Sequence, residues 1–226
     1  MKRRSPQQSG LALLMGLVIM AALALLALVA TASMALQVRM ASNFNDIQQA
    51  RLGGVEAVRR GSQFLLGLRH DARLSDCTSD CFESPLAGLI HLAGYWPALP
   101  EHQSAAWWQA QAIEIGIDPL TGEAGGNGWV FGNETPRYLI EEIHFAPADE
   151  SLPVPGAPAL EGVGYYRILG RATGQGPSAV AVSAAIVARP WLDLSAADPA
   201  SFQAADFCAD YRQWYDCGPV SWQQRR

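Results

Sequence analysis

Residues Leu11–Leu36 read LALLMGLVIMAALALLALVATASMAL and contain no Asp, Glu, Lys or Arg. As an α-helix, this run would rise about 39 Å, which exceeds the roughly 30 Å hydrocarbon core of a bilayer. A buried helix of a globular domain rarely needs so long an apolar run. The stretch therefore predicts a transmembrane helix over residues 11–36, and the chain has no second apolar stretch of similar length.

The charges beside this run predict its orientation. Lys2, Arg3 and Arg4 precede it, and Arg39 is the one basic residue close behind it. The positive-inside rule then places the N-terminus in the cytoplasm and everything after Leu36 outside. We therefore expect a single-pass membrane protein with one exported domain.

The composition narrows the class of protein further. The chain has 226 residues, of which 50% are hydrophobic and 16% charged, which is too apolar for a disordered protein. Its net charge of −5 argues against a nucleic-acid partner bound through an overall positive field. The length allows one domain plus an appendage.

Three interpretations of the apolar run remain open. A cleaved secretory signal needs an apolar core of only about 7–15 residues, although Ala30–Ala32 and Ser33–Ala35 resemble its cleavage sites. A plain signal anchor fits the hydropathy equally well. The third interpretation is a type IV prepilin, with a leader over residues 1–10 (MKRRSPQQSG) and cleavage between Gly10 and Leu11.

The helical pattern continues after the apolar run as an amphipathic stalk over residues 37–66. The chain contains no Pro from Gln7 to Ser84, and apolar residues recur on one helical face at Phe44, Ile47, Val55, Val58 and Leu65. The plain interpretation is a helix packed on its own domain, and the second adds contacts to neighbouring subunits. Both can hold, because the buried half of such a stalk would lie on the domain while the other end projects. Gly54 and Gly61 fall at the edge of this face and would leave a shallow groove there.

Residues 67–226 predict a globular domain outside the membrane. Ser104–Ile115 reads as a short helix with Ser104 as its N-cap.

An antiparallel meander of three or four strands is expected over about residues 129–189, and its strands are 129–131, 136–145, 164–173 and 179–188. The last of these strands is apolar on both faces and should be central or covered. The tail over residues 190–226 carries aromatics and two cysteines but little periodicity. Together these features predict an α+β fold, in which a long N-terminal helix packs on a small antiparallel sheet.

Several segments resemble the PilX-type minor pilins of type IV pili. The resemblance covers roughly residues 7–66 and 136–189, in the same order, and it rests on five segments: QQSGLALLMGLVIMAALALL, ARLGGVEAVRRG, PRYLIEEI, YYRILGRATG and AVAVSAAIVAR. It implies the lollipop shape of a type IV pilin, held first in the inner membrane with a periplasmic domain and later placed at the pilus tip on the cell surface. It also implies a non-enzymatic subunit without a cofactor, which prepilin peptidase cleaves and which primes pilus assembly in the tip complex. Its partners would be V- and W-type minor pilins, a large tip adhesin and the major pilin, and its roles adhesion and twitching motility.

One position departs from the major pilins. They carry Glu at the fifth mature position, where this chain has Met15. That Glu is thought to pair with the terminal amine of a neighbouring subunit in an apolar fibre, where an unpaired charge is costly. The absence of an acid resembles PilX-type pilins and the K-type pseudopilins of type II secretion, and it favours a place at the tip. A K-like pseudopilin is therefore the nearest alternative, and a signal-anchored periplasmic domain of unknown activity is the second.

Four cysteines in an exported chain are expected to be oxidised. We favour the pairs Cys77–Cys81 and Cys208–Cys217, because each closes a short loop, although cross-pairing stays open. Neither spacing matches a zinc finger, so we expect no metal site.

No catalytic motif stands out in the rest of the chain. The histidines His70, His91, His102 and His144 show no metal-ligand spacing, and no nucleophile elbow or phosphate loop is present. A weak calcium site near Asp71, Asp76, Asp80 and Glu83 is conceivable only by the resemblance to K-type pseudopilins. The plainer interpretation is a solvated acidic loop. Glu141, Glu142, Arg167 and Arg171 are expected to form cross-strand ion pairs.

Overall fold

The computed structural model describes residues 7–74, 77, 81–84, 86–124, 132–149, 155–157, 159–176, 178–192 and 207–225. Its helices are α1 (Gln7–Leu66), α2 (Ala105–Gln111) and α3 (Phe207–Tyr211). Its strands are β1 (Ile90–Leu92), β2 (Ile113–Glu114), β3 (Arg137–Pro147), β4 (Leu160–Thr173), β5 (Val180–Leu192) and β6 (Gly218–Arg225). The chain divides into two compact units, Met1–Asn45 and Asp46–Arg226.

Helix α1 runs without a break for 60 residues. The chain has no proline inside it, so every interior backbone N–H can donate along the helix. It ends just before Gly67, whose N–H donates to the carbonyl of Gln63 at 3.0 Å. The prediction that the apolar run continues as a helix to Leu66 is confirmed.

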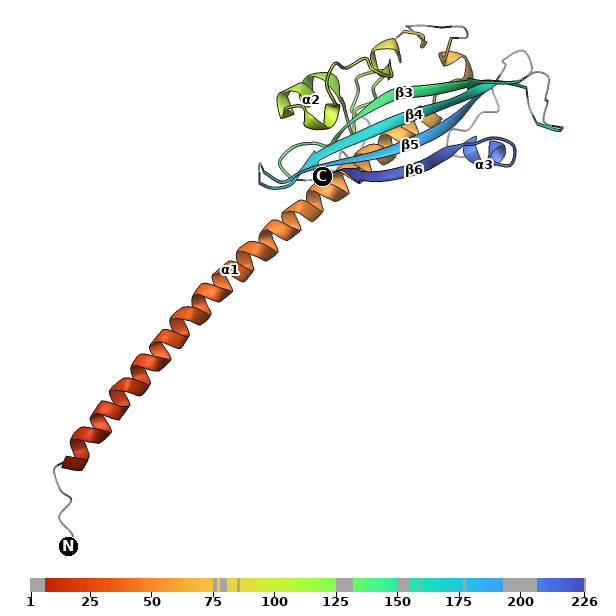
Figure 1. Ribbon diagram of the computed structural model, residues 1–226. Helices are drawn as coiled ribbons and strands as arrows, with labels where there is room; N and C mark the ends of the chain where they lie inside the picture. Colours follow the sequence, from red (N-terminus) through yellow and green to blue (C-terminus); the bar gives the residue numbers. More distant parts are fainter. Residues whose placement is uncertain are drawn as a thin grey trace. The chain divides into compact units, whose positions relative to one another are not determined.

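The sheet is larger than the meander predicted from the sequence. Figure 1 shows β3, β4, β5 and β6 side by side, and these four strands are antiparallel neighbours. The six-stranded sheet has the order β1-β3-β4-β5-β6, with β2 also paired to β3. Strand β1 runs parallel to β3, with Ile90 opposite Ile140. The predicted fold class, a helix on a mostly antiparallel sheet, is confirmed.

Three of the predicted strands correspond to β3, β4 and β5, although each is longer than expected. β5 lies between β4 and β6, as its two apolar faces indicate. The expected strand at residues 129–131 lies outside the described residues. The sheet extends beyond the expected range of about 129–189, because residues 218–225 of the tail form β6.

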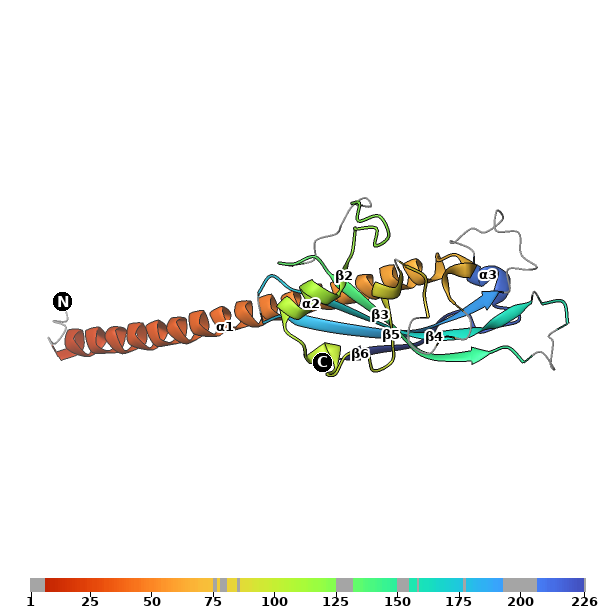
Figure 2. The same ribbon diagram turned by 90° about the horizontal axis from the view of Figure 1, so that it is seen from above.

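Each face of the sheet carries its own apolar cluster. From Asp46 onward, α1 lies against one face (Figure 2), where Ala57, Val58 and Leu65 join a cluster with side chains of β3, β4 and β5. On the other face Trp108 of α2 packs with Leu139 and Leu169. Ser104 caps α2 as predicted, since its hydroxyl accepts a hydrogen bond from the Trp107 N–H at 3.2 Å.

The apolar face predicted for the stalk is only partly covered. Val58 and Leu65 are fully buried, but Phe44 is 65% exposed and Ile47 is 43% exposed. Helical spacing indicates the direction of an apolar face, but it does not indicate where the covering surface ends.

The two stalk glycines make close contact instead of leaving a groove. A Cβ atom on Gly61 would lie 2.8 Å from Ile168 Cγ2 and 2.8 Å from the Tyr138 ring. On Gly54 it would lie 3.2 Å from the Ser183 hydroxyl. Glycine at these positions therefore lets α1 approach the sheet more closely than any other residue would allow.

Candidate functional site

The N-terminal part of α1 presents a continuous apolar surface. Every side chain from Leu11 to Leu36 is exposed. Among the described residues, α1 is the one helix long and apolar enough to cross a membrane, with a mean hydropathy of 2.9 over its best 18-residue window and none of that window buried. A helix of this kind can serve as a membrane anchor or as a signal.

The residues of the proposed cleavage site belong to this helix. Gly10 and Leu11 both lie within α1, and Met15 is one turn further on, with its side chain exposed. Residues 1–6 of the expected leader lie outside the described residues. The apolar side chain of Met15 is therefore part of the apolar surface of α1.

Asp46 ties α1 to the sheet where the second unit begins. Its carboxylate accepts hydrogen bonds from the backbone N–H of Gln175 and, at 2.9 Å, from that of Gly176. Both donors lie in the turn between β4 and β5. Gly174 approaches Asp46 so closely that a Cβ atom there would clash with it. This contact could not be predicted from the sequence, because an acid in a helix gives no sign of a partner some 130 residues away.

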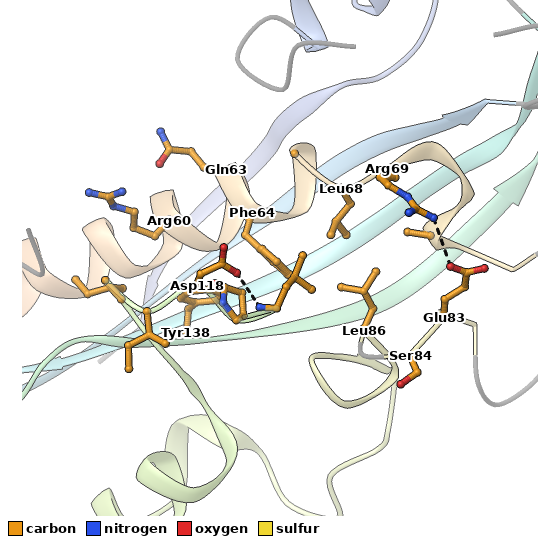
Figure 3. Close-up of a pocket in the computed structure, with 17 residues that line it drawn as sticks. Arg60, Gln63, Phe64, Leu68, Arg69, Glu83, Ser84, Leu86, Asp118 and Tyr138 are labelled. Carbon is orange, nitrogen blue, oxygen red and sulfur yellow. Dashed lines mark hydrogen bonds and ion pairs between the residues drawn. The ribbon is translucent and has the colours of Figure 1, made fainter. Parts of the chain in front are cut away.

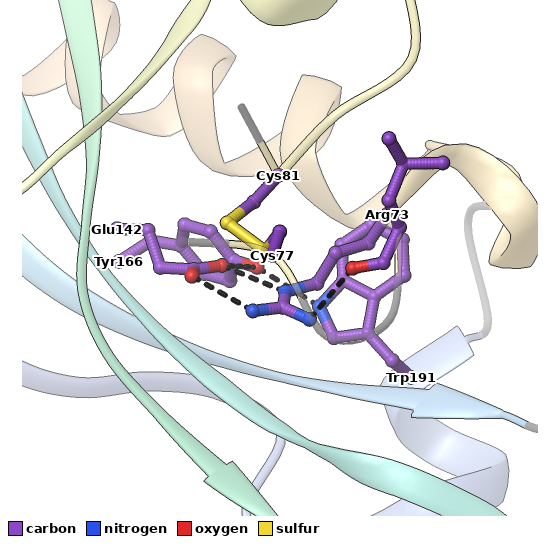
Figure 4. Close-up of a disulfide and its surroundings, with 7 residues drawn as sticks. Arg73, Cys77, Cys81, Glu142, Tyr166 and Trp191 are labelled. Carbon is purple, nitrogen blue, oxygen red and sulfur yellow. Dashed lines mark hydrogen bonds and ion pairs between the residues drawn. A yellow bond between two sulfur atoms is a disulfide. The ribbon is translucent and has the colours of Figure 1, made fainter. Parts of the chain in front are cut away.

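A buried polar network lies beside the first disulfide (Figure 4). The Arg73 guanidinium donates to both carboxylate oxygens of Glu142 at 3.0 Å. The Tyr166 hydroxyl donates to Glu142 at 2.7 Å, and the Trp191 indole N–H donates to the Tyr166 oxygen at 2.9 Å. Burial, together with the negative charge of Glu142, raises the pKa of Tyr166 well above its usual value, so the hydroxyl keeps its proton.

Arg189 is a second fully buried cation. It donates one hydrogen bond to the carbonyl of Leu68, and its guanidinium stacks 3.7 Å from the centroid of Trp191. Burial lowers the pKa of Arg189 to about 9. This residue ties β5 to the segment that follows α1.

The two disulfides have the pairing that the sequence favours. Cys77 bonds to Cys81, and Cys208 bonds to Cys217. The first bond closes the turn beside Arg73, because the Leu74 N–H donates to the Cys81 carbonyl at 2.9 Å and residues 73 and 82 form a β-bridge. The second bond joins α3 to the residue just before β6.

The expected cross-strand ion pairs are confirmed in part. Glu141 of β3 pairs with Arg167 of β4, as their register requires. Glu142 instead pairs with Arg73, which follows α1. Arg171 pairs at 3.1 Å with Glu134, which precedes β3. Arg73 and Glu134 both lie outside the two strands that were expected to form these ion pairs.

A cleft of about 540 Å³ lies between the last turns of α1 and the loop that follows β2 (Figure 3). The apolar walls come from Phe64 of α1, from Leu68, which follows the helix, and from Leu86. Polar residues of both signs also line it, namely Arg60, Arg69, Glu83 and Asp118. Burial raises the pKa of the lining residue Tyr138, and the nearby Asp118 raises it further while Arg60 opposes this. This cleft could not be predicted from local sequence patterns, because its walls come from four separate segments.

The described part of the chain holds no group of three His, Cys, Asp or Glu side chains arranged to bind a metal ion. In the acidic loop, Asp71 pairs with Arg69 at 2.7 Å, whereas Asp76 and Asp80 lie outside the described residues. His91 stacks on Tyr95 with ring centroids 4.1 Å apart, and burial lowers its pKa against the opposing effect of Glu141.

Comparison with known proteins finds no relative for this chain: no protein-family model, curated protein or solved structure matches it. The architecture itself, a long apolar N-terminal helix packed on an antiparallel sheet, is pilin-like.

Proposed function

We propose that this chain is a PilX-type minor pilin, a non-enzymatic subunit that primes type IV pilus assembly and sits in the tip complex. One observation carries the proposal: a single unbroken helix follows Gly10, exposes an apolar surface over Leu11–Leu36 and then packs on an antiparallel sheet. Such a helix can hold the domain to the inner membrane and later pack against other helices in a fibre.

In this proposal prepilin peptidase cuts between Gly10 and Leu11. The cut removes the basic leader and leaves the apolar helix attached to the domain. The domain faces the periplasm until the helix is withdrawn from the membrane, after which the subunit stands at the pilus tip on the cell surface. Its partners are V- and W-type minor pilins, the major pilin and a large tip adhesin, which together support adhesion and twitching motility.

The identity of residue 15 favours a subunit located at the pilus tip over one located in the shaft. A shaft subunit needs an acid near the amine of its neighbour, because an unpaired charge inside an apolar bundle is costly. Met15 offers no such acid. We expect Met15→Glu to increase the amount of this chain in sheared pili relative to the major pilin, as quantified by mass spectrometry.

The decisive experiment is N-terminal sequencing of the full chain expressed with and without prepilin peptidase. The proposal predicts Leu11 as the new N-terminus only when the peptidase is present. Gly10→Val should abolish cleavage, whereas Gly16→Val, a matched change inside the same apolar helix, should leave it intact. An unprocessed Met1, or a cut near Ala35, contradicts the proposal and favours a signal anchor or a secretory signal.

A K-like pseudopilin of type II secretion is the second candidate, because Met15 suits that family as well. Deletion of the gene separates the two. Loss of surface pili and twitching supports the minor pilin, whereas loss of protein secretion with normal pili supports the pseudopilin.

A further inference from the structure

Strand β6 forms an open edge of the sheet (Figure 1). Among the described strands, β5 is its one partner. No backbone hydrogen bond joins residues 219–225 to any other described part of the chain. In an antiparallel ladder, every second residue of an edge strand directs its N–H and C=O away from its neighbour. These groups of β6 are therefore available to pair with a further strand.

The two ends of β6 discourage such pairing, but its middle does not. Pro219 has no N–H and lies at a bulge, where the register with β5 shifts between Pro219 and Ser221. Arg225 lies at the other end of the strand. Proline, bulges and charged residues are the usual means by which proteins protect an edge strand. Residues 220–224 (VSWQQ) contain neither a proline nor a charge, so the edge is open over this stretch.

The same stretch exposes two apolar side chains. Val220 and Trp222 are each 48% exposed. Trp222 lies opposite Ala185, which belongs to the apolar cluster beneath α1, so its side chain lies on that face of the sheet. A strand added beside β6 would place one of its own side chains next to Trp222. Tryptophan is enriched in the interfaces between proteins and among their strongest contacts.

An extended polypeptide is the occupant that this edge can recognise. Its backbone repeats donors and acceptors every two residues, as β6 does. A helix satisfies its own backbone groups, and hydrocarbon offers none.

The charges favour a strand from a different protein over a second copy of β6. Residues 218–226 contain two arginines and no acid. A second copy laid parallel would set arginine beside arginine, which is destabilising, and one laid antiparallel would offer them no carboxylate. A strand that carries an acid near Arg225 suits this edge better.

We infer that β6 accepts, over residues 220–224, an extended strand of a different protein. The added strand is uncharged in its middle, has an apolar side chain next to Trp222 and carries an acid near Arg225. In strand addition the main-chain hydrogen bonds supply affinity, and the alternate side chains supply specificity. The inference goes beyond the proposed function, because it depends only on the sheet of the second unit.

Hydrogen exchange of the full chain in detergent tests this pairing. The probes are two short synthetic peptides of alternating Val and Thr, one with Glu at its N-terminal end and one with Glu at its C-terminal end. We expect one of them to slow exchange about tenfold at backbone amides within residues 220–224, but not in α2. The same peptide with every amide N-methylated cannot donate to the edge and should give no protection. This comparison uses the unchanged chain, so it does not depend on the folding of a variant.

Trp222→Glu should abolish the protection, because it puts a charge beside the added strand. Leu120→Glu is the matched control: Leu120 is 47% exposed and lies in the loop after β2, which pairs with β3 and not with β6. In cells, the photoreactive residue p-benzoylphenylalanine in place of Trp222 should crosslink to a different protein. Mass spectrometry should locate the crosslink in a segment with the predicted pattern of side chains.

Four outcomes overturn the inference: no protection by either peptide, equal protection by the N-methylated peptide, a crosslink to a second copy of this chain, and a crosslink to lipid. N-terminal sequencing of the same chain separates this failure from failure of the proposed function. Cleavage after Gly10 without protection of β6 rejects strand addition alone. An uncleaved chain whose β6 is protected rejects the pilin assignment alone.

Discussion

The guanidinium of Arg73 forms a two-point ion pair with the carboxylate of Glu142, at 3.0 Å on each side, across 69 residues of sequence. Both side chains are almost fully buried, and the Arg73 guanidinium also lies 3.4 Å from the centroid of the Phe145 ring. The turn that presents Arg73 is closed by the disulfide between Cys77 and Cys81. The pair thus fastens the segment after α1 to the middle of β3.

Arg73→Met should destabilise the domain by about 3–5 kcal/mol, because it leaves the charge of Glu142 buried without its cationic partner. Chemical denaturation of the full chain in detergent, followed by tryptophan fluorescence, measures the change, since Trp191 is part of the same network. Arg69→Met is the control: its side chain is 72% exposed, so loss of its solvent-screened ion pairs should change the free energy of unfolding far less than Arg73→Met does. Equal effects of the two substitutions would show that the buried pair has no special role.

Gly61→Ala should destabilise the domain by about 1–3 kcal/mol, because the new methyl group meets Ile168 and Tyr138 at 2.8 Å. This sign is opposite to helix propensity, which favours Ala over Gly by about 1 kcal/mol. A Cβ atom on Gly16 would have no neighbouring atom within 4 Å, so Gly16→Ala should not destabilise the domain. The shift of the urea midpoint measures both changes, and a stabilised Gly61→Ala variant would contradict the close packing of α1.

Asp46→Ala should cost about 2 kcal/mol, the usual value for hydrogen bonds to a charged group. The loss should be local as well, because the carboxylate holds the backbone N–H groups of Gln175 and Gly176. Hydrogen exchange at these two amides should become faster in the variant. Asp71→Ala removes an exposed carboxylate from another ion pair and should leave both amides unchanged. Unaltered exchange in Asp46→Ala would reject the contact.

The stability of the domain should fall as the pH rises above about 10. Burial raises the pKa of Tyr138 and of Tyr166 above the usual value of about 10, so the folded state keeps protons that the unfolded chain releases. Each tyrosine therefore lowers the stability above about pH 10, by at most about 1.4 kcal/mol per pH unit. Arg189, whose pKa burial lowers to about 9, releases its proton earlier in the folded state than in the unfolded chain, and it therefore offsets about one of these two losses. Unfolding measured between about pH 9 and pH 11 tests this.

Tyr138→Phe is the informative variant in that series. It removes one of the two titrating tyrosines, and among the described residues the Tyr138 hydroxyl makes no hydrogen bond that the substitution would break. The dependence of the unfolding free energy on pH above about 10 should therefore become shallower, by the equivalent of up to about one bound proton. The same slope in the variant and in the unchanged chain would mean that other groups control the alkaline loss.

The sequence by itself determined the long helix and the class of fold. An uncharged run of 26 residues followed by a proline-free stretch leaves few alternatives to a continuous helix, since every interior N–H finds its partner four residues away. The cap at Ser104 and the strands β3, β4 and β5 were equally accessible, because their signals lie within a few neighbouring residues. Short spacing also favoured the two disulfide pairs.

Only the tertiary structure decided the rest. β6 shows little alternation in its sequence and gains its structure from pairing with β5, with Ala185 opposite Trp222. The exposure of Phe44, the partner of Glu142 and the cleft beside Phe64 all depend on segments that are distant in the chain. Local sequence patterns indicate which side chains are apolar enough to be buried. They do not indicate which distant segment covers those side chains or where that covering surface ends.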